Sequence, residues 1–221
     1  MGLLNAMPIF KVDLSNPNPA VVAEIAGLLK SGAVIAFPTD TFYGLGADIY
    51  NDNAVQRIFE IKGRTHDKPI LVLISDREGL MPLISTKNIP PFAERLMDEF
   101  WPGPLTMVFH ASSIIPEVLT SATGKIGIRL PDHIFCRTLI EKLGRPITAT
   151  SANISGMRSL DNPSDVLDSM GDRIDALIDG GVTQGGCEST VIDVTGDEPV
   201  ILREGALPVS YIKAVLSGDR S

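Results

Sequence analysis

Short apolar runs alternate with amphipathic stretches along most of this chain, and that alternation limits the possible folds more than any other feature. Between residues 19 and 30, apolar side chains recur at helical spacing, at Val22, Ile25, Ala26 and Leu29. Ser31-Gly32 then ends the pattern, and the apolar residues 34–37 follow as a short buried strand. Strand-like runs that alternate with helical stretches are typical of an α/β domain.

The same pattern continues toward the C-terminus. It predicts strands over residues 9–14, 34–37, 70–74, 105–109, 126–130, 147–150, 176–178, 191–194 and 200–202. It predicts helices over residues 19–30, 91–100, 133–143, 164–170 and 209–216, and one that Asp52 or Asn53 caps and that ends at Lys62. No repeat or Pro/Gly/Ser-rich linker divides the chain. We therefore expect a single domain over residues 1–221, with a core at about 9–216 and a mixed, twisted sheet.

Composition narrows the function. The 221 residues are 44% hydrophobic and 21% charged, which is ordinary for a globular protein with one sizeable core. The formal net charge of −8 argues against a dedicated nucleic-acid binder, because a polyanion could bind only at a local basic patch. The two cysteines, Cys136 and Cys187, lack metal-ligand spacing, and no apolar run is long enough to span a bilayer. We expect a cytoplasmic protein with reduced thiols.

Four polar segments follow predicted strands or helices, and open α/β sheets usually bind ligands at strand ends. These segments are PTDTFYGLGAD (38–48), KGRTHDKP (62–69), TSANISG (150–156) and GGCESTVID with its continuation ILREG (185–205). Each has a functional interpretation and a plain structural alternative.

Two of the segments carry positive charge. Lys62, Arg64 and Lys68 crowd three cations into the turn after a helix, which fits a phosphate clamp. The alternative is that they complement the helix C-terminus. The glycine loop at 185–186 and Arg203 would suit an anion, although a glycine hairpin with a surface arginine fits equally well.

The other two segments carry hydroxyl and amide groups. Gly44 and Gly46 allow a tight turn or a close approach to a ligand, and Thr41 lies beside them. Ser151 and Asn153 can read donors and acceptors on a small polar ligand. Ordinary turns explain both segments as well.

The remaining reactive side chains do not form a catalytic motif. His66, His110 and His133 lie far apart without metal-ligand spacing, and no G-x-S-x-G elbow is present. We therefore predict no protein-bound metal and no covalent nucleophile. The polar segments indicate a site that binds and polarises phosphates.

Taken together, the segments resemble the threonylcarbamoyl-AMP synthase family, also known as the YrdC/Sua5 family. The resemblance covers roughly residues 9–216 in order, and includes FWPGPLTMVF, GKIGIRLPDH and PITATSANISG as well as the four segments above. It implies a twisted open α/β sheet with flanking helices and a concave basic cleft. It also implies a nucleotidyltransferase that joins L-threonine, bicarbonate and ATP into threonylcarbamoyl-AMP and pyrophosphate, for the N6-threonylcarbamoyladenosine modification of tRNA.

The resemblance also implies residue roles. L-Threonine would be held by Thr41, Arg129, Ser151 and Ser189. ATP would be surrounded by Lys62, Arg64, Lys68, Asn153 and Arg203, with Ser121 or Thr123 also in contact. Of these, Lys62, Arg64 and Lys68 would be catalytic, stabilising the phosphates together with Mg²⁺ that accompanies ATP.

Partners and rival interpretations follow from the same resemblance. The product would pass to proteins that transfer the threonylcarbamoyl group to tRNA, and a direct RNA or tRNA contact remains open. One alternative is an RNA-binding module of the same fold without synthase activity. Another is a carbamoyl-transfer domain of the hydrogenase-maturation type, but its acylphosphatase and zinc-finger segments are not apparent in this sequence.

Overall fold

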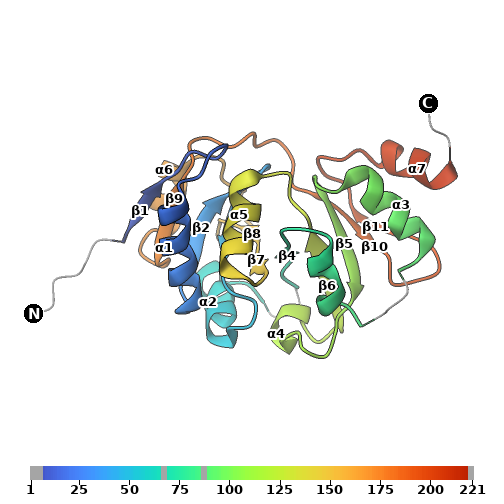
Figure 1. Ribbon diagram of the computed structural model, residues 1–221, viewed down its shortest axis with the longest axis horizontal. Coiled ribbons are helices and arrows are strands. Elements are labelled where there is room, and N and C mark those ends of the chain that lie inside the picture. Colours follow the sequence, from blue (N-terminus) through green and yellow to red (C-terminus); the bar gives the residue numbers. More distant parts are fainter. Residues whose placement is uncertain (1–6, 66–68, 86–88, 219–221) are drawn as a thin grey trace, which may run out of the picture.

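The computed structural model describes residues 7–65, 69–85 and 89–218, and its strands form two mixed sheets that lie side by side (Figure 1). The first sheet has the order β1 (Ile9–Lys11), β9 (Ala176–Asp179), β2 (Ile35–Pro38), β3 (Tyr43–Gly46), β8 (Thr150–Ser151). The second has the order β11 (Val200–Arg203), β10 (Thr190–Asp193), β5 (Leu105–His110), β6 (Lys125–Arg129), β4 (Val72–Leu73), β7 (Ile147–Thr148). Both sheets contain parallel and antiparallel pairs.

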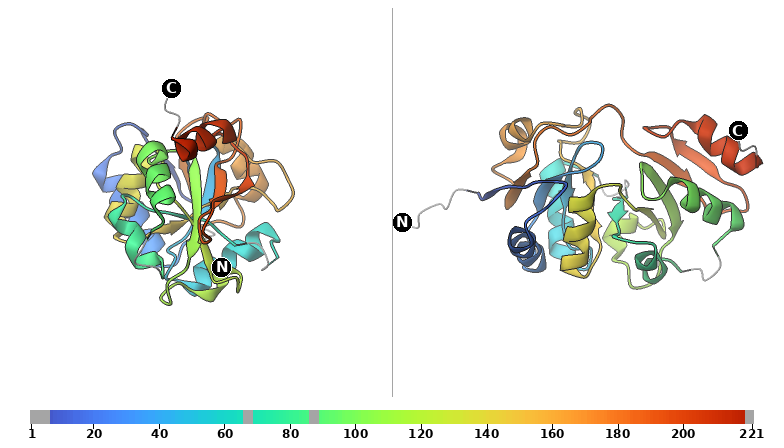
Figure 2. Two further views of the ribbon diagram at one scale, coloured as in Figure 1. Left: turned by 90° about the vertical axis from the view of Figure 1, so that its right-hand side faces the viewer. Right: turned by 45° about the horizontal axis from the view of Figure 1, so that its top comes forward.

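Helices flank both sheets. They are α1 (Pro19–Lys30), α2 (Asp52–Lys62), α3 (Pro91–Phe100), α4 (Glu117–Thr120), α5 (Ile134–Leu143), α6 (Pro163–Met170), α7 (Val209–Ser217) and the 3₁₀ helix η1 (Glu78–Leu83). Helices α1 and α5 pack against each other beside the first sheet, and α3 packs on α7 at the far end of the second (Figures 1 and 2). None of the helices in the described residues is long and apolar enough to cross a membrane.

Helix α1 shows how local sequence sets these elements. The Asn18 side chain caps the helix by accepting a hydrogen bond from Ala20 N at 2.9 Å, and Pro19 occupies the first turn, where its missing N–H is harmless. The predicted apolar stripe of α1 is buried against Phe37 and Phe135 in one hydrophobic cluster. Burial of one such large apolar side chain contributes roughly 1.5–3 kcal/mol, which secures the helix.

Helix α2 positions the basic segment that follows it. It begins at Asp52, capped by Asn51, whose side chain accepts from Ala54 N at 3.0 Å; the predicted caps Asp52 and Asn53 were wrong by one or two residues. Gly63 ends the helix in the left-handed conformation with φ of 56°, which glycine adopts without strain. This turn sends the chain from Lys62 back toward the sheets.

The two sheets meet at residues 147–151, where the sequence predicted one strand in one sheet. Instead, β7 pairs with β4 of the second sheet and β8 pairs with β3 of the first. Thr148 reaches both sheets, because its N donates to Ala47 O at 2.9 Å and its hydroxyl accepts from Ala47 N at 2.9 Å. The predicted mixed α/β class is confirmed, with its strands divided between two sheets.

Strand β3 was not predicted, because its glycines were interpreted as a turn or a ligand approach. All four residues of β3 are buried, and it pairs with β2 and β8. A Cβ at Gly46 would lie 2.7 Å from Phe37 Cε1, so the neighbouring ring leaves no room for a larger residue. Gly46 therefore reflects close strand packing.

Candidate functional site

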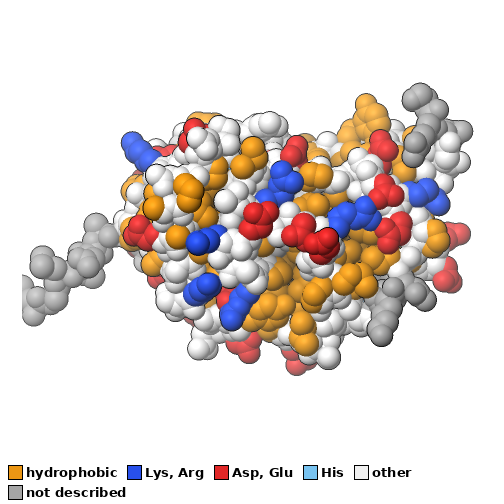
Figure 3. Space-filling view, in the orientation of Figure 1, with side chains coloured by type: hydrophobic (Ala, Val, Ile, Leu, Met, Phe, Trp, Pro, Cys, Tyr) orange, Lys and Arg blue, Asp and Glu red, His pale blue; other side chains and the backbone are white. Residues whose placement is uncertain are grey.

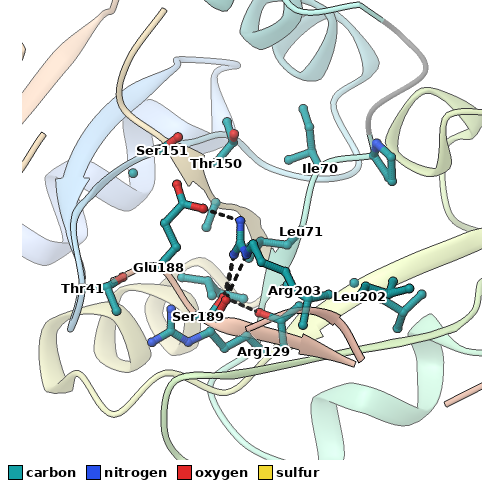
Figure 4. A pocket seen from close by; sticks show the side chains of 18 of the residues that line it. Thr41, Ile70, Leu71, Arg129, Thr150, Ser151, Glu188, Ser189, Leu202 and Arg203 are labelled. Carbon is teal, nitrogen blue, oxygen red and sulfur yellow. Dashed lines mark hydrogen bonds and ion pairs between the residues drawn. The ribbon is translucent and has the colours of Figure 1, made fainter. Parts of the chain in front are cut away.

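A cavity of about 430 Å³ lies between one face of the second sheet and the β3–β8 edge of the first. Its floor comes from alternate residues of three neighbouring strands, since a strand turns every second side chain to the same face. These are Thr106 and Val108 on β5, Lys125, Gly127 and Arg129 on β6, and Val191 and Asp193 on β10. Thr41, Thr150 and Ser151 close the opposite wall (Figure 4).

Most of the predicted site residues meet at this cavity, although they are far apart in sequence. Its lining includes all four residues predicted for L-threonine, namely Thr41, Arg129, Ser151 and Ser189. It also includes Arg64, Thr123 and Arg203 from the set predicted for ATP.

The other predicted residues lie elsewhere. Lys62 and Asn153 are buried and do not line the cavity, although both contact Ser151. Ser121 borders a second cavity together with Gln56 and Glu117. Lys68 lies outside the described residues.

Arg129 is held rigidly at the cavity floor. Its side chain is only 5% exposed, and its Nη2 pairs with Asp40 Oδ2 at 2.5 Å. Its Nε donates to Gly103 O at 2.9 Å. Burial lowers the pKa of Arg129, and the Asp40 carboxylate opposes that shift. The planar guanidinium is thus preoriented, which suits recognition of a ligand carboxylate.

Ser189 lies beside Arg129 and is tied to two other side chains. Its hydroxyl shares a hydrogen bond of 2.8 Å with the hydroxyl of Thr106. Arg203 Nη2 donates to Ser189 O at 2.8 Å and also approaches the Ser189 hydroxyl at 3.4 Å. Figure 4 shows the Arg203 guanidinium directed toward both Ser189 and the carboxylate of Glu188, with which it forms an ion pair.

Carboxylates of the chain balance much of the positive charge in the cavity. Among the described residues, four basic ones line it, Arg64, Lys125, Arg129 and Arg203, against two acidic ones, Glu188 and Asp193. Lys125 Nζ pairs with Asp193 Oδ2 at 2.7 Å, and Arg129 and Arg203 pair as described above. Basic and acidic side chains are likewise interspersed across the face shown in Figure 3.

Lys62 does not line the cavity but contacts the backbone of Ser151, which does. Its residue is 1% exposed, and its ammonium donates to Ser151 O, to Asn153 O at 2.8 Å and to Asn153 Oδ1 at 2.9 Å. The pKa of Lys62 is lowered to about 7, mainly by burial and also by the positive charge of Arg64, while Glu188 opposes the shift.

Comparison with known proteins decides the family. The Sua5/YciO/YrdC family model, which is described as telomere recombination, matches residues 27–205. The chain belongs to this family. The resemblance inferred from the motifs is therefore confirmed.

The relatives agree in sequence and in fold. A threonylcarbamoyl-AMP synthase of Pyrococcus abyssi is 46% identical over 195 residues, covering 88% of this chain and 57% of that protein. One of Bacillus subtilis is 41% identical over 206 residues, covering 92% and 58%. The crystal structure of P. abyssi Sua5 complexed with L-threonine matches with a TM-score of 0.89 at 43% identity, over 94% of this chain and 60% of that chain. This chain thus spans less than two thirds of these relatives.

Within this Sua5/YciO/YrdC domain, sequence reasoning missed the residues that compensate charge. Asp40, Glu188 and Asp193 all lie within recognised motifs, but only the folded chain shows which cation each one meets. Lys125 directly precedes the predicted strand 126–130, and it could have been found by extending that strand by one residue, because it lies four positions before Arg129 and so on the same face. Thr106 could have been found by the same argument from β5.

Metal ligation has no dedicated residues in the described part of the chain. Residues 7–65, 69–85 and 89–218 contain no group of three or more His, Cys, Asp or Glu side chains placed to hold a metal ion. Cys136 is buried, where burial raises its thiol pKa, and Cys187 is exposed; neither forms a disulfide.

Proposed function

We propose that this chain forms threonylcarbamoyl-AMP and pyrophosphate from L-threonine, bicarbonate and ATP, for N6-threonylcarbamoyladenosine in tRNA. One observation carries the proposal: a single cavity brings a rigid arginine and three hydroxyl residues beside further basic residues. The names of the P. abyssi and B. subtilis relatives support it, as does the P. abyssi structure complexed with L-threonine.

The amino acid would bind on the Arg129 side of the cavity. The guanidinium of Arg129 would pair with the threonine carboxylate, because Asp40 and Gly103 already fix its plane. The hydroxyls of Thr41, Ser151 and Ser189 would face the polar groups of threonine. Buried hydroxyls reject a ligand that leaves them unpaired, so this arrangement would select for a hydroxyl on the substrate.

The ATP phosphates would bind to Arg64 and Arg203 of the cavity lining, and Thr123 of the same lining would contact them as well. Lys68, in the same segment as Arg64, is proposed to join them. Because Arg203 pairs with Glu188 in the free chain, a phosphate would replace that carboxylate as its partner. Arginine suits this exchange, since it binds carboxylate and phosphate in the same forked geometry.

The chemistry needs alignment and charge stabilisation. The threonine amine and bicarbonate condense to a carbamate with loss of water, and a carbamate oxygen then attacks the α-phosphate. The bond to the β-phosphate breaks, and pyrophosphate leaves with its electron pair. The carbamate is already a nucleophile, so the basic residues would act by positioning the reactants and stabilising negative charge on the phosphates.

Mg²⁺ is proposed to arrive with ATP. The carboxylates in the cavity lining, Glu188 and Asp193, are each paired with a cation. Mg²⁺ typically keeps several waters and binds through substrate phosphates and one or two carboxylates, so these two residues could complete such a set. The ion would contribute charge neutralisation at the phosphates.

The decisive experiment is incubation of the protein with ATP, bicarbonate and labelled L-threonine, followed by detection of the adenylate and of pyrophosphate. Both products should require all three substrates, and Arg64→Met, which changes a basic residue of the cavity lining, should strongly reduce them. Binding of threonine and ATP without formation of the adenylate would contradict the proposed reaction.

The RNA-binding alternative makes a different prediction. A module that grips an RNA backbone should lose affinity steeply with salt, by about 10³-fold or more between about 50 and 200 mM if it makes six or more phosphate contacts. A pocket for threonine and ATP should not follow that slope.

We propose that the chain works in the cytoplasm and passes its product to proteins that transfer the threonylcarbamoyl group, whether or not it contacts tRNA itself.

A further inference from the structure

Lys62 has no hydrogen-bond donor left for a ligand. An ammonium carries three N–H donors, and those of Lys62 point to Ser151 O, Asn153 O and Asn153 Oδ1. The backbone O of Lys62 also accepts from Ser155 N at 2.9 Å. The end of α2 therefore holds the 151–155 segment through both its side chain and its backbone.

These contacts fix the orientation of the Asn153 amide. The Asn153 Nδ2 donates to Met157 O, so the amide oxygen faces Lys62 and accepts a hydrogen bond from its Nζ at 2.9 Å. Asn153 is 6% exposed, so this arrangement is shielded from water. Its Oδ1 is thereby directed to a second donor, the hydroxyl of Ser151, at 2.7 Å.

The Ser151 hydroxyl has only one proton, and that proton points to Asn153. Ser151 lines the cavity wall above Glu188 and Thr41 (Figure 4). It therefore offers the cavity only the lone pairs of its oxygen. A fully ionised phosphate oxygen has no proton to donate, whereas the amine and hydroxyl of an amino acid both do.

We propose that Lys62 and Asn153 are positioning residues that act through Ser151, so that its oxygen accepts a hydrogen bond from the amino-acid substrate. They bind neither the phosphates nor the threonine directly. This inference rests on the proposed function and deepens it, because it assigns the buried Lys62–Asn153–Ser151 chain to amino-acid recognition. It differs from the ATP contacts that the family resemblance implies for Lys62 and Asn153.

A double-mutant cycle tests the chain directly. Dissociation constants for L-threonine and, at saturating threonine, for ATP are measured by calorimetry for the parent, Ser151→Ala, Asn153→Ala and the double variant. Each single variant should weaken threonine binding about five- to tenfold, the equivalent of one hydrogen bond. Because Asn153 acts only through Ser151, the double variant should bind threonine within about twofold of Ser151→Ala. ATP affinity should stay within about twofold throughout.

Two further variants separate positioning from phosphate contact. Asn153→Asp keeps the acceptor for both Lys62 and Ser151 but loses the Nδ2 donor to Met157 O, so the variant is compared once urea unfolding shows that it is folded. Its threonine and ATP affinities should then stay within about threefold of the parent values. A phosphate contact at this position would instead make the new carboxylate repel ATP by tenfold or more. Arg64→Met, which changes a lining residue predicted for ATP, serves as the matched comparison and should weaken ATP binding alone.

Lys62→Met removes the ammonium at similar length. It should weaken threonine binding about tenfold and leave ATP affinity unchanged. Loss of ATP affinity as large as that of Arg64→Met, with threonine binding intact, would overturn the inference. So would additive effects in the Ser151 and Asn153 cycle, which stays decisive if Lys62→Met does not fold. A parent protein that binds neither ligand refutes the proposed function itself, and is thus a distinct outcome.

Discussion

Removing either partner of the Asp40–Arg129 ion pair should strongly destabilise the fold. The two side chains are 14% and 5% exposed, and their charged atoms are 2.5 Å apart. Breaking a buried pair by deleting one partner costs about 3–5 kcal/mol, because the remaining charge is left buried without compensation. We expect Arg129→Met to fall in that range. Asp40→Asn should fall near its lower end, because the amide oxygen still accepts one hydrogen bond from Arg129.

The double variant Asp40→Asn/Arg129→Met tests the reasoning, because it removes both charges. Its loss of stability should be smaller than the sum of the single losses by about 1–3 kcal/mol, the usual coupling between contacting residues. Urea unfolding at neutral pH gives the free energy of unfolding for each protein, provided the denaturant slope m stays constant.

The exposed ion pair between Arg57 and Asp175 supplies the matched control. Its side chains are 40% and 36% exposed, so Arg57→Met should cost less than about 1 kcal/mol. The account of a buried and coupled pair would be refuted if Asp40→Asn and Arg129→Met each lost no more stability than Arg57→Met. It would also be refuted if the two losses of stability simply added in the double variant. Both single variants should also lose pyrophosphate release with threonine.

Three other measurements follow from the structure. The pKa of Lys62 is lowered from 10.5 to about 7, mainly by burial, with Arg64 and Glu188 as the neighbouring charges. Between about pH 7 and pH 10.5 the unfolded chain therefore binds one more proton than the folded chain. The free energy of unfolding of the parent should rise by a few kcal/mol across that pH window relative to that of Lys62→Met. Pyrophosphate release should decrease in the order threonine, serine, valine, with serine disfavoured by about 1–3 kcal/mol; valine turning over as fast as threonine would contradict a hydroxyl-selective cavity. Gly46→Ala should destabilise the protein by about 1–3 kcal/mol in urea, because its Cβ would meet the Phe37 ring at 2.7 Å; an unchanged midpoint would show that the ring can move.

The helices were largely predictable from the sequence. The predicted bounds 19–30 and 91–100 coincide with α1 and α3, since prolines at their first turns and the apolar period are local signals. Helix α2 was predicted with the wrong cap, because Asn51, Asp52 and Asn53 are all good capping residues and only backbone geometry chooses among them. The short α4 and η1 were missed, since neither is long enough to show a period.

The strands were less predictable where pairing decides the structure. Residues 147–150 were predicted as one strand, yet the folded chain divides that region between β7 and β8 in different sheets. Strand β3 was missed because Gly44 and Gly46 disfavour a strand by local propensity. Packing against Phe37 overrides that propensity, and a sequence pattern does not contain that contact.

The sequence by itself determined the α/β class, the family and seven of the residues that line the cavity. Helical and strand periods and the ordered motifs are all recorded in short stretches of chain, so they can be read without the fold. Only the tertiary structure decided which side chains face the cavity. It placed Arg203 and Arg129 at the lining with Glu188 and Asp40 as their partners, and it turned Lys62 inward to Ser151 and away from the cavity. Such contacts join residues tens of positions apart, and they depend on strand pairing and burial, which local propensity does not specify.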